Sequence, residues 1–141
     1  MSSNINFNTE NEMINEARHI LSGMGITSFL GVPCFSRCID LVLSIDNKLI
    51  AIEFKLHDWR RGMIQAEHHL VAVDFSYVCL PAKSVTEKMQ NMFVKSDVGL
   101  MMFTVNGKSP FKIIFPAKPS KKKWDIGERW LRKALETGVA R

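Results

Sequence analysis

The stretch that most constrains the fold runs from Leu49 to Leu56, where apolar side chains occupy every position except two. A short run that is apolar on both faces is typical of a central strand buried between two layers. The exceptions are Glu53 and Lys55, which lie two residues apart and therefore point to the same side of a strand. Burying an acid and a base at the end of such a strand is costly unless they pair or bind something. We therefore expect chemistry at this position.

A hairpin brings a third charged residue to the same patch. The residues 37–45 form a second expected strand, and the segment Asp46-Asn47-Lys48 forms the turn. With Asn47 and Lys48 at the tip, Asp40 lies opposite Lys55 and Val42 lies opposite Glu53. This register is an assumption because the turn has no glycine. A slip of one residue would move Asp40 to the other face of the sheet.

Two carboxylates and an ammonium group on one patch suit the hydrolysis of phosphodiester bonds. Asp40 and Glu53 offer the hard oxygen ligands that Mg²⁺ prefers, and a bound metal lowers the pKa of its water. Lys55 could position the attacking water or stabilise charge on the phosphate. The alternative is an ion pair with a purely structural role in the hairpin.

The order of the following elements predicts an α/β fold. Asp58 is the expected N-cap of a helix that runs to Leu70 and carries Gln65, and residues 74–80 form a buried strand. A strand, a helix and a strand in this order imply parallel pairing. We further expect a helix over 84–95 capped by Ser84, and a hairpin that joins 98–105 to 111–115 through Asn106-Gly107.

These motifs carry a resemblance to a known family. Asp40, the Glu53-x-Lys55 pair, Gln65 on the next helix and Tyr77 on the next strand resemble the PD-(D/E)XK nuclease superfamily. Within it, the chain is similar to small stand-alone members such as Holliday-junction resolvases, VRR-NUC proteins and MmcB-like DNA-repair proteins. The resemblance covers about residues 8–103. One departure is Ile39, which stands where the pattern that names the family has proline, a position that varies across the superfamily.

The resemblance implies a restriction-endonuclease-like, three-layer α/β fold with a mixed central sheet flanked by helices. It implies Mg²⁺ or Mn²⁺ held by Asp40, Glu53 and the backbone carbonyl of Phe54, with Lys55 assisting the nucleophile. Its members often dimerise so that two sites cut two strands of DNA. The implied function is a deoxyribonuclease of repair, recombination or defence. A non-cleaving nucleic-acid-binding module or a regulatory subunit is the alternative.

The resemblance also implies a glutamate on the first helix that is aimed at the metal site. Thr9 and Glu12 form the capping box of this helix, which we expect to end near Ser22. Glu10 is followed three and four residues later by the apolar Met13 and Ile14, and it therefore fits the metal-site role best. Glu16 is the second choice. Glu10 could also serve only the helix dipole, and Gln65 could be an ordinary exposed residue.

The charge of the chain favours a polyanionic partner. The net charge is +5 and the isoelectric point is near 9.3. The expected contacts with DNA phosphates are Arg37, Arg60, Arg61, Lys121, Lys122 and Lys123. Residues 117–123 are a basic linker, and a helix follows over 124–136. The lysines could equally be a solvated linker, with the helix docked by its tryptophans or packed on a second subunit.

The 141 residues suit one unit, with a nuclease-like domain over 1–116 and the basic linker and amphipathic helix of 117–141 belonging to it. The three cysteines lie in apolar surroundings and lack paired spacing, which favours reduced thiols in a cytoplasmic protein over a zinc site. No apolar run approaches the length of a membrane span. We interpret His57, His68 and His69 as surface or packing residues.

Overall fold

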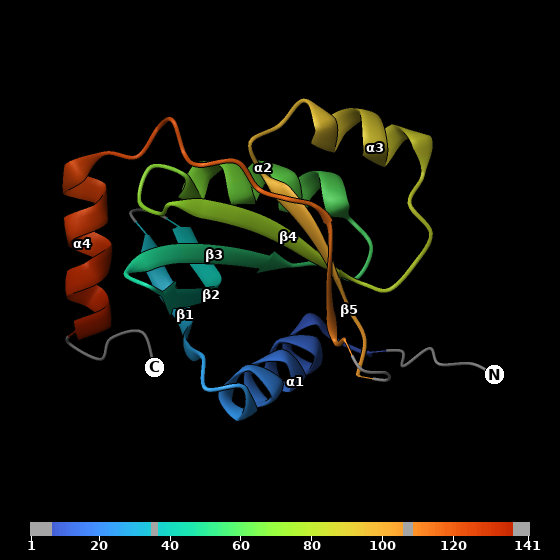
Figure 1. Cartoon of the computed structure of the whole chain (residues 1–141), viewed down its shortest axis with the longest axis horizontal. Helices are drawn as coiled ribbons and strands as arrows, with labels where there is room; N and C mark the ends of the chain where they lie inside the picture. Colours follow the sequence, from blue (N-terminus) through green and yellow to red (C-terminus); the bar gives the residue numbers. More distant parts are fainter. Residues whose placement is uncertain (1–6, 35–36, 106–108, 137–141) are drawn as a thin grey trace.

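The computed structural model describes residues 7–34, 37–105 and 109–136. One six-stranded sheet forms its centre, with the strands in the order β1-β2-β3-β4-β5-β6 (Figure 1). The strands are β1 (Thr27–Cys34), β2 (Arg37–Ile45), β3 (Lys48–Phe54), β4 (Phe75–Pro81), β5 (Gly99–Phe103) and β6 (Phe111–Phe115). The helices are α1 (Glu10–Gly23), α2 (Trp59–His69), α3 (Glu87–Val94) and α4 (Asp125–Glu136).

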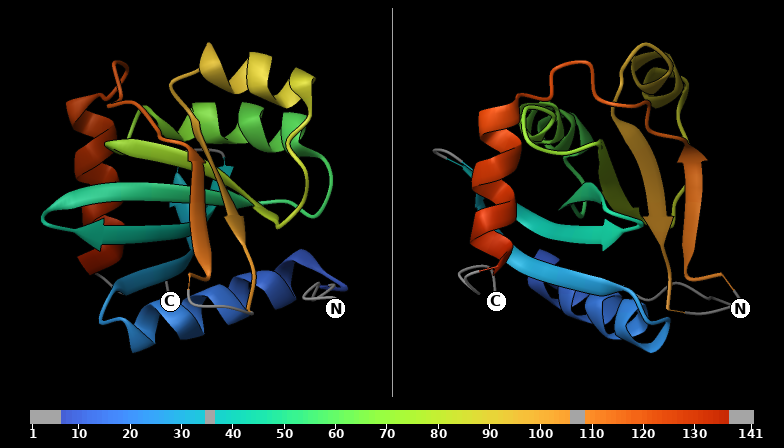
Figure 2. Two further views of the ribbon diagram at one scale, coloured as in Figure 1. Left: turned by 45° about the vertical axis from the view of Figure 1, so that its right-hand side comes forward. Right: turned by 60° about the vertical axis from the view of Figure 1, so that its left-hand side comes forward.

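The sheet is mixed, as the sequence predicted. The first three strands pair in antiparallel order, β3 runs parallel to β4 and β4 parallel to β5, and β6 returns antiparallel to β5. The helices α2 and α3, which connect the parallel strands, lie on one face of the sheet, and α1 lies on the other (Figure 2). This arrangement confirms the α/β class with a mixed sheet between helices. The turn expected at Asn106-Gly107 lies outside the described residues.

The helix α1 covers its face through a stripe set by helical spacing. The side chain of Thr9 accepts a hydrogen bond from the backbone nitrogen of Glu12, as expected for its cap. Met13, Ile14 and Ala17 follow on the buried side and pack against residues of β2, β3 and β5. Burying a side chain such as Met13 contributes roughly 1.5–3 kcal/mol, so packing rather than propensity holds the helix in place.

On the opposite face, α2 begins where the sequence predicted and α3 does not. Asp58 Oδ1 accepts from the backbone nitrogen of Arg61 and caps α2. The helix α3 is capped by Thr86 instead of Ser84: the Thr86 hydroxyl accepts a hydrogen bond from the backbone nitrogen of Met89, and Met89 and Phe93, four residues apart, lie in the core. Both residue types are good N-caps, and tertiary burial decides between them.

The β2–β3 hairpin has a different register from the expected one. Asp46 and Asn47 form the tip, with φ angles of 51° and 64°, and the pairs run from Ile45 opposite Lys48 to Leu41 opposite Ile52. Two consecutive left-handed residues fit a type I′ turn, which asparagine and aspartate tolerate without glycine. The assumed tip at Asn47 and Lys48 was wrong, and the pairing is shifted by two residues. An even shift keeps every side chain on its expected face.

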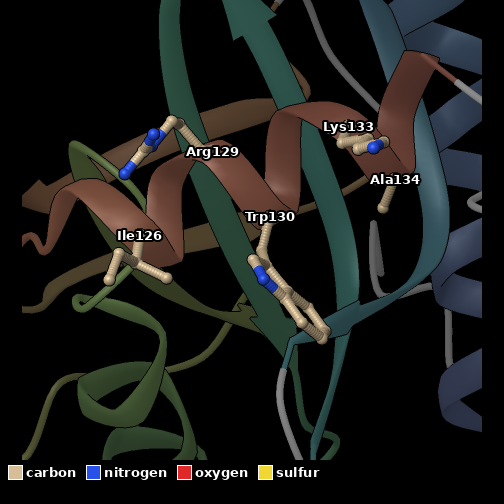
Figure 3. Close-up of a pocket in the computed structure, with 5 residues that line it drawn as sticks. All are labelled: Ile126, Arg129, Trp130, Lys133 and Ala134. Atoms are coloured by element: carbon tan, nitrogen blue, oxygen red, sulfur yellow. The ribbon is translucent and has the colours of Figure 1, made fainter.

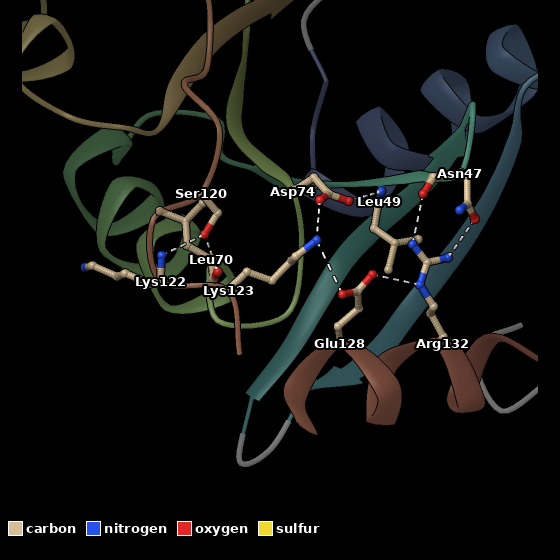
Figure 4. A network of polar contacts seen from close by, with 9 residues as sticks. All are labelled: Asn47, Leu49, Leu70, Asp74, Ser120, Lys122, Lys123, Glu128 and Arg132. Atoms are coloured by element: carbon tan, nitrogen blue, oxygen red, sulfur yellow. Dashed lines mark hydrogen bonds and ion pairs between the residues drawn. The ribbon is translucent and has the colours of Figure 1, made fainter. Parts of the chain in front are cut away.

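The C-terminal segment packs against the sheet through a polar network (Figure 4) and through the apolar side chains of Leu131 and Leu135. Lys123 Nζ lies 2.6 Å from Asp74 Oδ1 and 3.3 Å from Glu128 Oε1. Arg132 donates to the side chain and the backbone carbonyl of Asn47, and Leu131 is buried in the cluster that includes residues of β1 and β2. These contacts place α4 beside the β2–β3 turn, at the opposite end of β3 from the predicted site (Figure 1).

Candidate functional site

Two carboxylates of neighbouring strands meet at the end of β3. Continuing the observed register by one step places Asp40 opposite Glu53. Asp40 Oδ2 accepts from the backbone nitrogen of Phe54 at 2.9 Å, and Glu53 Oε1 accepts from the backbone nitrogen of Asp40 at 3.4 Å. The expectation that Asp40 faced Lys55, and Val42 faced Glu53, was wrong because the turn begins one residue earlier. The observed pairing brings the two acids closer than that expectation did.

The environment of Asp40 penalises its charge. Burial raises the pKa of its carboxyl group to about 7, and the neighbouring charge of Glu53 adds to the increase. The hydrogen bond from Phe54 and the positive charge of Lys55 act in the opposite direction. Near neutral pH, binding a proton or a cation therefore stabilises this carboxylate pair. This is the behaviour expected of carboxylates at a functional site.

His69 is a member of the site that the sequence did not predict. Its Nε2 lies 2.8 Å from Glu53 Oε1, and the two side chains are 1% and 4% exposed. Its Nδ1 is buried without a partner in the described residues. His69 is buried, which agrees with the interpretation as a packing residue and not with a surface position, but its partner Glu53 was not predicted. Helical spacing was the available signal, because His69 follows the core residue Ala66 by three positions.

Lys55 follows the last residue of β3 and is half-buried beside α2. A Cβ atom placed on Gly62 would lie 2.9 Å from Lys55 Cγ and 3.2 Å from Val78 Cγ1. Glycine at position 62 therefore lets α2 approach the lysine stem closely. Lys55 belongs to the same end of β3 as Glu53, and its charge affects Asp40. The three residues thus share one end of the sheet.

Two further predicted residues lie at the border of this site. Glu10 Oε2 accepts from the backbone nitrogen of Leu56 at 3.3 Å, so the start of α1 contacts the segment after β3. Glu16 is exposed, and Glu12 is exposed and accepts from the nitrogen of Asn8. Gln65 is half-buried on α2, and its Oε1 has no hydrogen-bond partner in the described residues. An orphaned buried oxygen of this kind can accept from an ammonium group or a water molecule.

The cationic candidates divide into exposed and engaged groups. Arg37, Arg61, Lys121 and Lys122 are exposed, and Arg60 is exposed with its guanidinium 5.0 Å from the centre of the Trp59 ring. Lys123 is engaged by Asp74 and Glu128. These two contacts favour a structural role for Lys123 over the expected contact with phosphate, which stays a prediction. Tyr77, which could have lined the site, instead accepts a hydrogen bond from the nitrogen of Ala117.

The donor set bears on the predicted metal. Among the described residues, no three histidine, cysteine, aspartate or glutamate side chains are grouped to hold a metal ion. Asp40 and Glu53 supply two carboxylates, and Mg²⁺ is usually held by one or two carboxylates together with waters. The residues present therefore fit Mg²⁺ or Mn²⁺. They fit zinc less well, because a structural zinc site is closed by four protein ligands. In the described part of the chain, no helix has the length and apolarity to cross a bilayer.

Comparisons with known proteins bear on the fold alone. No family model and no curated protein matches the chain. A solved structure with a similar fold is SPO1766, a protein of unknown function from Silicibacter pomeroyi. The TM-score is 0.65 at 15% sequence identity, and the alignment covers 97% of this chain and 90% of that one. The likeness extends over the whole α/β unit, including the C-terminal helix.

Proposed function

We propose that this protein is a divalent-metal-dependent nuclease that hydrolyses phosphodiester bonds of DNA. The observation that carries the proposal is the pair formed by Asp40, which is half-buried, and Glu53, which is buried, where two neighbouring strands pair at the end of β3. Proteins rarely place two acids together in this way without a compensating cation. The order α1-β1-β2-β3-α2-β4 supports the resemblance to the PD-(D/E)XK nucleases and a restriction-endonuclease-like fold.

Each side chain has a definite part in the proposed chemistry. Asp40, Glu53 and the carbonyl of Phe54 would hold Mg²⁺ or Mn²⁺, which when bound polarises a phosphoryl oxygen and acidifies a water. Lys55 stabilises negative charge that develops on the phosphate, at a position fixed by its packing against Gly62. His69 holds the Glu53 carboxylate in one orientation.

The remaining candidates support the site or the substrate. Glu10 fixes the backbone after β3, and the orphaned oxygen of Gln65 is available to a water or to the lysine. Arg37 starts β2 three residues before Asp40, and Arg60 and Arg61 lie in the first turn of α2. These exposed guanidinium groups would bind phosphates of the DNA backbone and fix its position without selecting a sequence.

One observation favours a second candidate, a nucleic-acid-binding module that does not cleave. Glu53 is 4% exposed and already bonded to His69, so one of the two carboxylates is engaged within the protein. In this alternative, the pair of Glu53 and His69 stabilises the fold and the surface arginines bind DNA. The two candidates differ in whether Lys55 is needed for a reaction.

The decisive experiment measures cleavage of single-stranded, duplex and four-way-junction DNA with Mg²⁺ or Mn²⁺. We expect Lys55→Ala and Asp40→Asn to lower the cleavage rate by about 10²-fold or more. Lys48→Ala is the matched control, since this exposed lysine lies at the other end of the same strand. Binding of every DNA without cleavage by the wild type would refute the nuclease and leave the binding module.

A further inference from the structure

The outward face of α4 carries aromatic and cationic side chains side by side (Figure 3). Trp130 is 66% exposed and Ile126 is 41% exposed, and both lie on the side of the helix away from Leu131. Figure 3 shows Trp130 between Ile126 and Ala134, with Arg129 and Lys133 along the adjoining side. These five residues border a surface hollow of about 650 Å³. A large exposed tryptophan is unusual on a surface that has only a solvating role.

The charges of this face select the class of ligand. Arg129 and Lys133 are exposed, and no hydrogen bond or ion pair engages either of them within the described residues. Asp125 and Glu136 lie further round the helix, while Glu128 faces Lys123 and Arg132. The surface beside Trp130 is therefore cationic, which favours an anionic ligand with a flat apolar group.

A second copy of the chain fits this face poorly. Two α4 helices related by a twofold axis would pack antiparallel, with the Trp130 residues at the centre. Arg129 and Lys133 are four residues apart and lie on the same flank of the helix, so the twofold axis would bring this flank against the same flank of the partner subunit. Like charges in such a position oppose association. This face of α4 therefore favours a polyanionic ligand over a second copy of the chain.

We propose that Arg129, Trp130 and Lys133 form a binding surface for single-stranded nucleic acid. An unpaired base can stack on the exposed indole ring, and adjacent phosphates can contact the guanidinium and ammonium groups. Duplex DNA offers its phosphates but not the faces of its bases. The bonds from Arg132 to Asn47 hold α4 beside the β2–β3 turn, which is at the other end of β3 from Glu53. Binding there is therefore independent of the proposed cleavage.

The test is fluorescence anisotropy with a labelled oligo(dT) strand, carried out in an Asp40→Asn background so that cleavage cannot interfere. We expect Trp130→Ala to weaken binding by about tenfold. The double variant Arg129→Ala, Lys133→Ala should reduce the slope of log K against log salt by about 1.4. Met92→Ala on α3 and Lys112→Ala on β6 are the matched controls, because both residues are exposed and distant from α4.

Several outcomes would overturn the proposal. Unchanged affinity in Trp130→Ala would exclude stacking, as would equal affinity for a duplex of the same length. Equal binding of poly-glutamate would show a general response to negative charge. A dimer that Trp130→Ala converts to a monomer in light scattering would show that a second copy covers this face. Loss of cleavage in Lys55→Ala with normal binding of oligo(dT) would leave both proposals in place.

Discussion

Replacing Lys123 by alanine tests whether this lysine belongs to the fold or to a DNA-binding surface. Its ammonium group lies 2.6 Å from Asp74 and 3.3 Å from Glu128, and its side chain is 29% exposed. Asp74 is buried and also accepts from the backbone nitrogen of Leu49 at 2.9 Å, so it cannot turn away when Lys123 is removed. The substitution therefore leaves a buried carboxylate with one partner fewer.

The expected loss follows from these contacts. A hydrogen bond to a charged group contributes about 1.5–3 kcal/mol, whereas a fully exposed ion pair contributes roughly 0–1 kcal/mol. The partial exposure of Lys123 places the loss near 2 kcal/mol, because the contact to Asp74 is short and the contact to Glu128 is longer. For a chain of this size the loss corresponds to a decrease of roughly 7 °C in Tm.

Urea denaturation of Lys123→Ala and Lys121→Ala measures the difference. Lys121 is the matched control, since its side chain is 78% exposed and its contact to Asp97 is 3.7 Å long. We expect its loss to stay within about 0.5 kcal/mol. Burial acts to raise the pKa of Asp74, but the hydrogen bonds from Lys123 and from the backbone nitrogen of Leu49 outweigh it and hold the pKa below its usual value of 3.8. The stabilisation is therefore present above pH 3.8 and is lost as pH falls through the lower pKa of the folded protein. Equal small losses in both variants, with weaker DNA binding in Lys123→Ala, would refute the structural role.

Three other predictions concern the site and the sheet. The folded protein retains a proton on Asp40 up to about pH 7 that the unfolded chain releases near pH 4, so stability falls as pH rises through this window. Asp40→Asn should remove that slope and be the more stable protein at pH 8 by chemical denaturation; an unchanged slope contradicts the raised pKa. Gly62→Ala places a Cβ 2.9 Å from Lys55 Cγ, so cleavage should slow by about tenfold with little change in stability, and an unaltered rate would show that Lys55 needs no such positioning. Gly99→Ala brings a Cβ within 2.5 Å of the nitrogen of Ala117 and 2.6 Å of the carbonyl oxygen of Phe115, and should cost about 3 kcal/mol in urea unfolding; a wild-type midpoint would mean that β5 and the residues after β6 pack less closely.

The hairpin shows why sequence can predict a face without predicting a register. The apolar pattern around Glu53 fixed which side of the strand is buried, and this pattern survives a shift by two residues. The tip of the turn can lie at residues 46–47 or at 47–48, and the choice depends on whether Asp46 adopts a left-handed backbone. Aspartate tolerates this conformation, but its presence does not require it. Asp40 therefore reached the expected patch through a pairing that the sequence did not specify.

The residues that the sequence misplaced depend on partners far along the chain. His69 became a site residue because Glu53, sixteen positions earlier, lies beneath α2. The sequence did not predict that Lys123 pairs with Asp74 and Glu128, because no local pattern links residues 74 and 123. Periodicity and caps describe neighbours within a few positions. They do not predict contacts between residues that are far apart in the sequence and meet only when the helices pack on the sheet.

The bonds from Arg132 to Asn47 join residues that are 85 positions apart. During synthesis the β2–β3 turn emerges well before the helix that later holds it, so the left-handed residues Asp46 and Asn47 must first set the pairing by themselves. In the folded protein, α4 then stabilises a turn whose register the chain has already had to set without it.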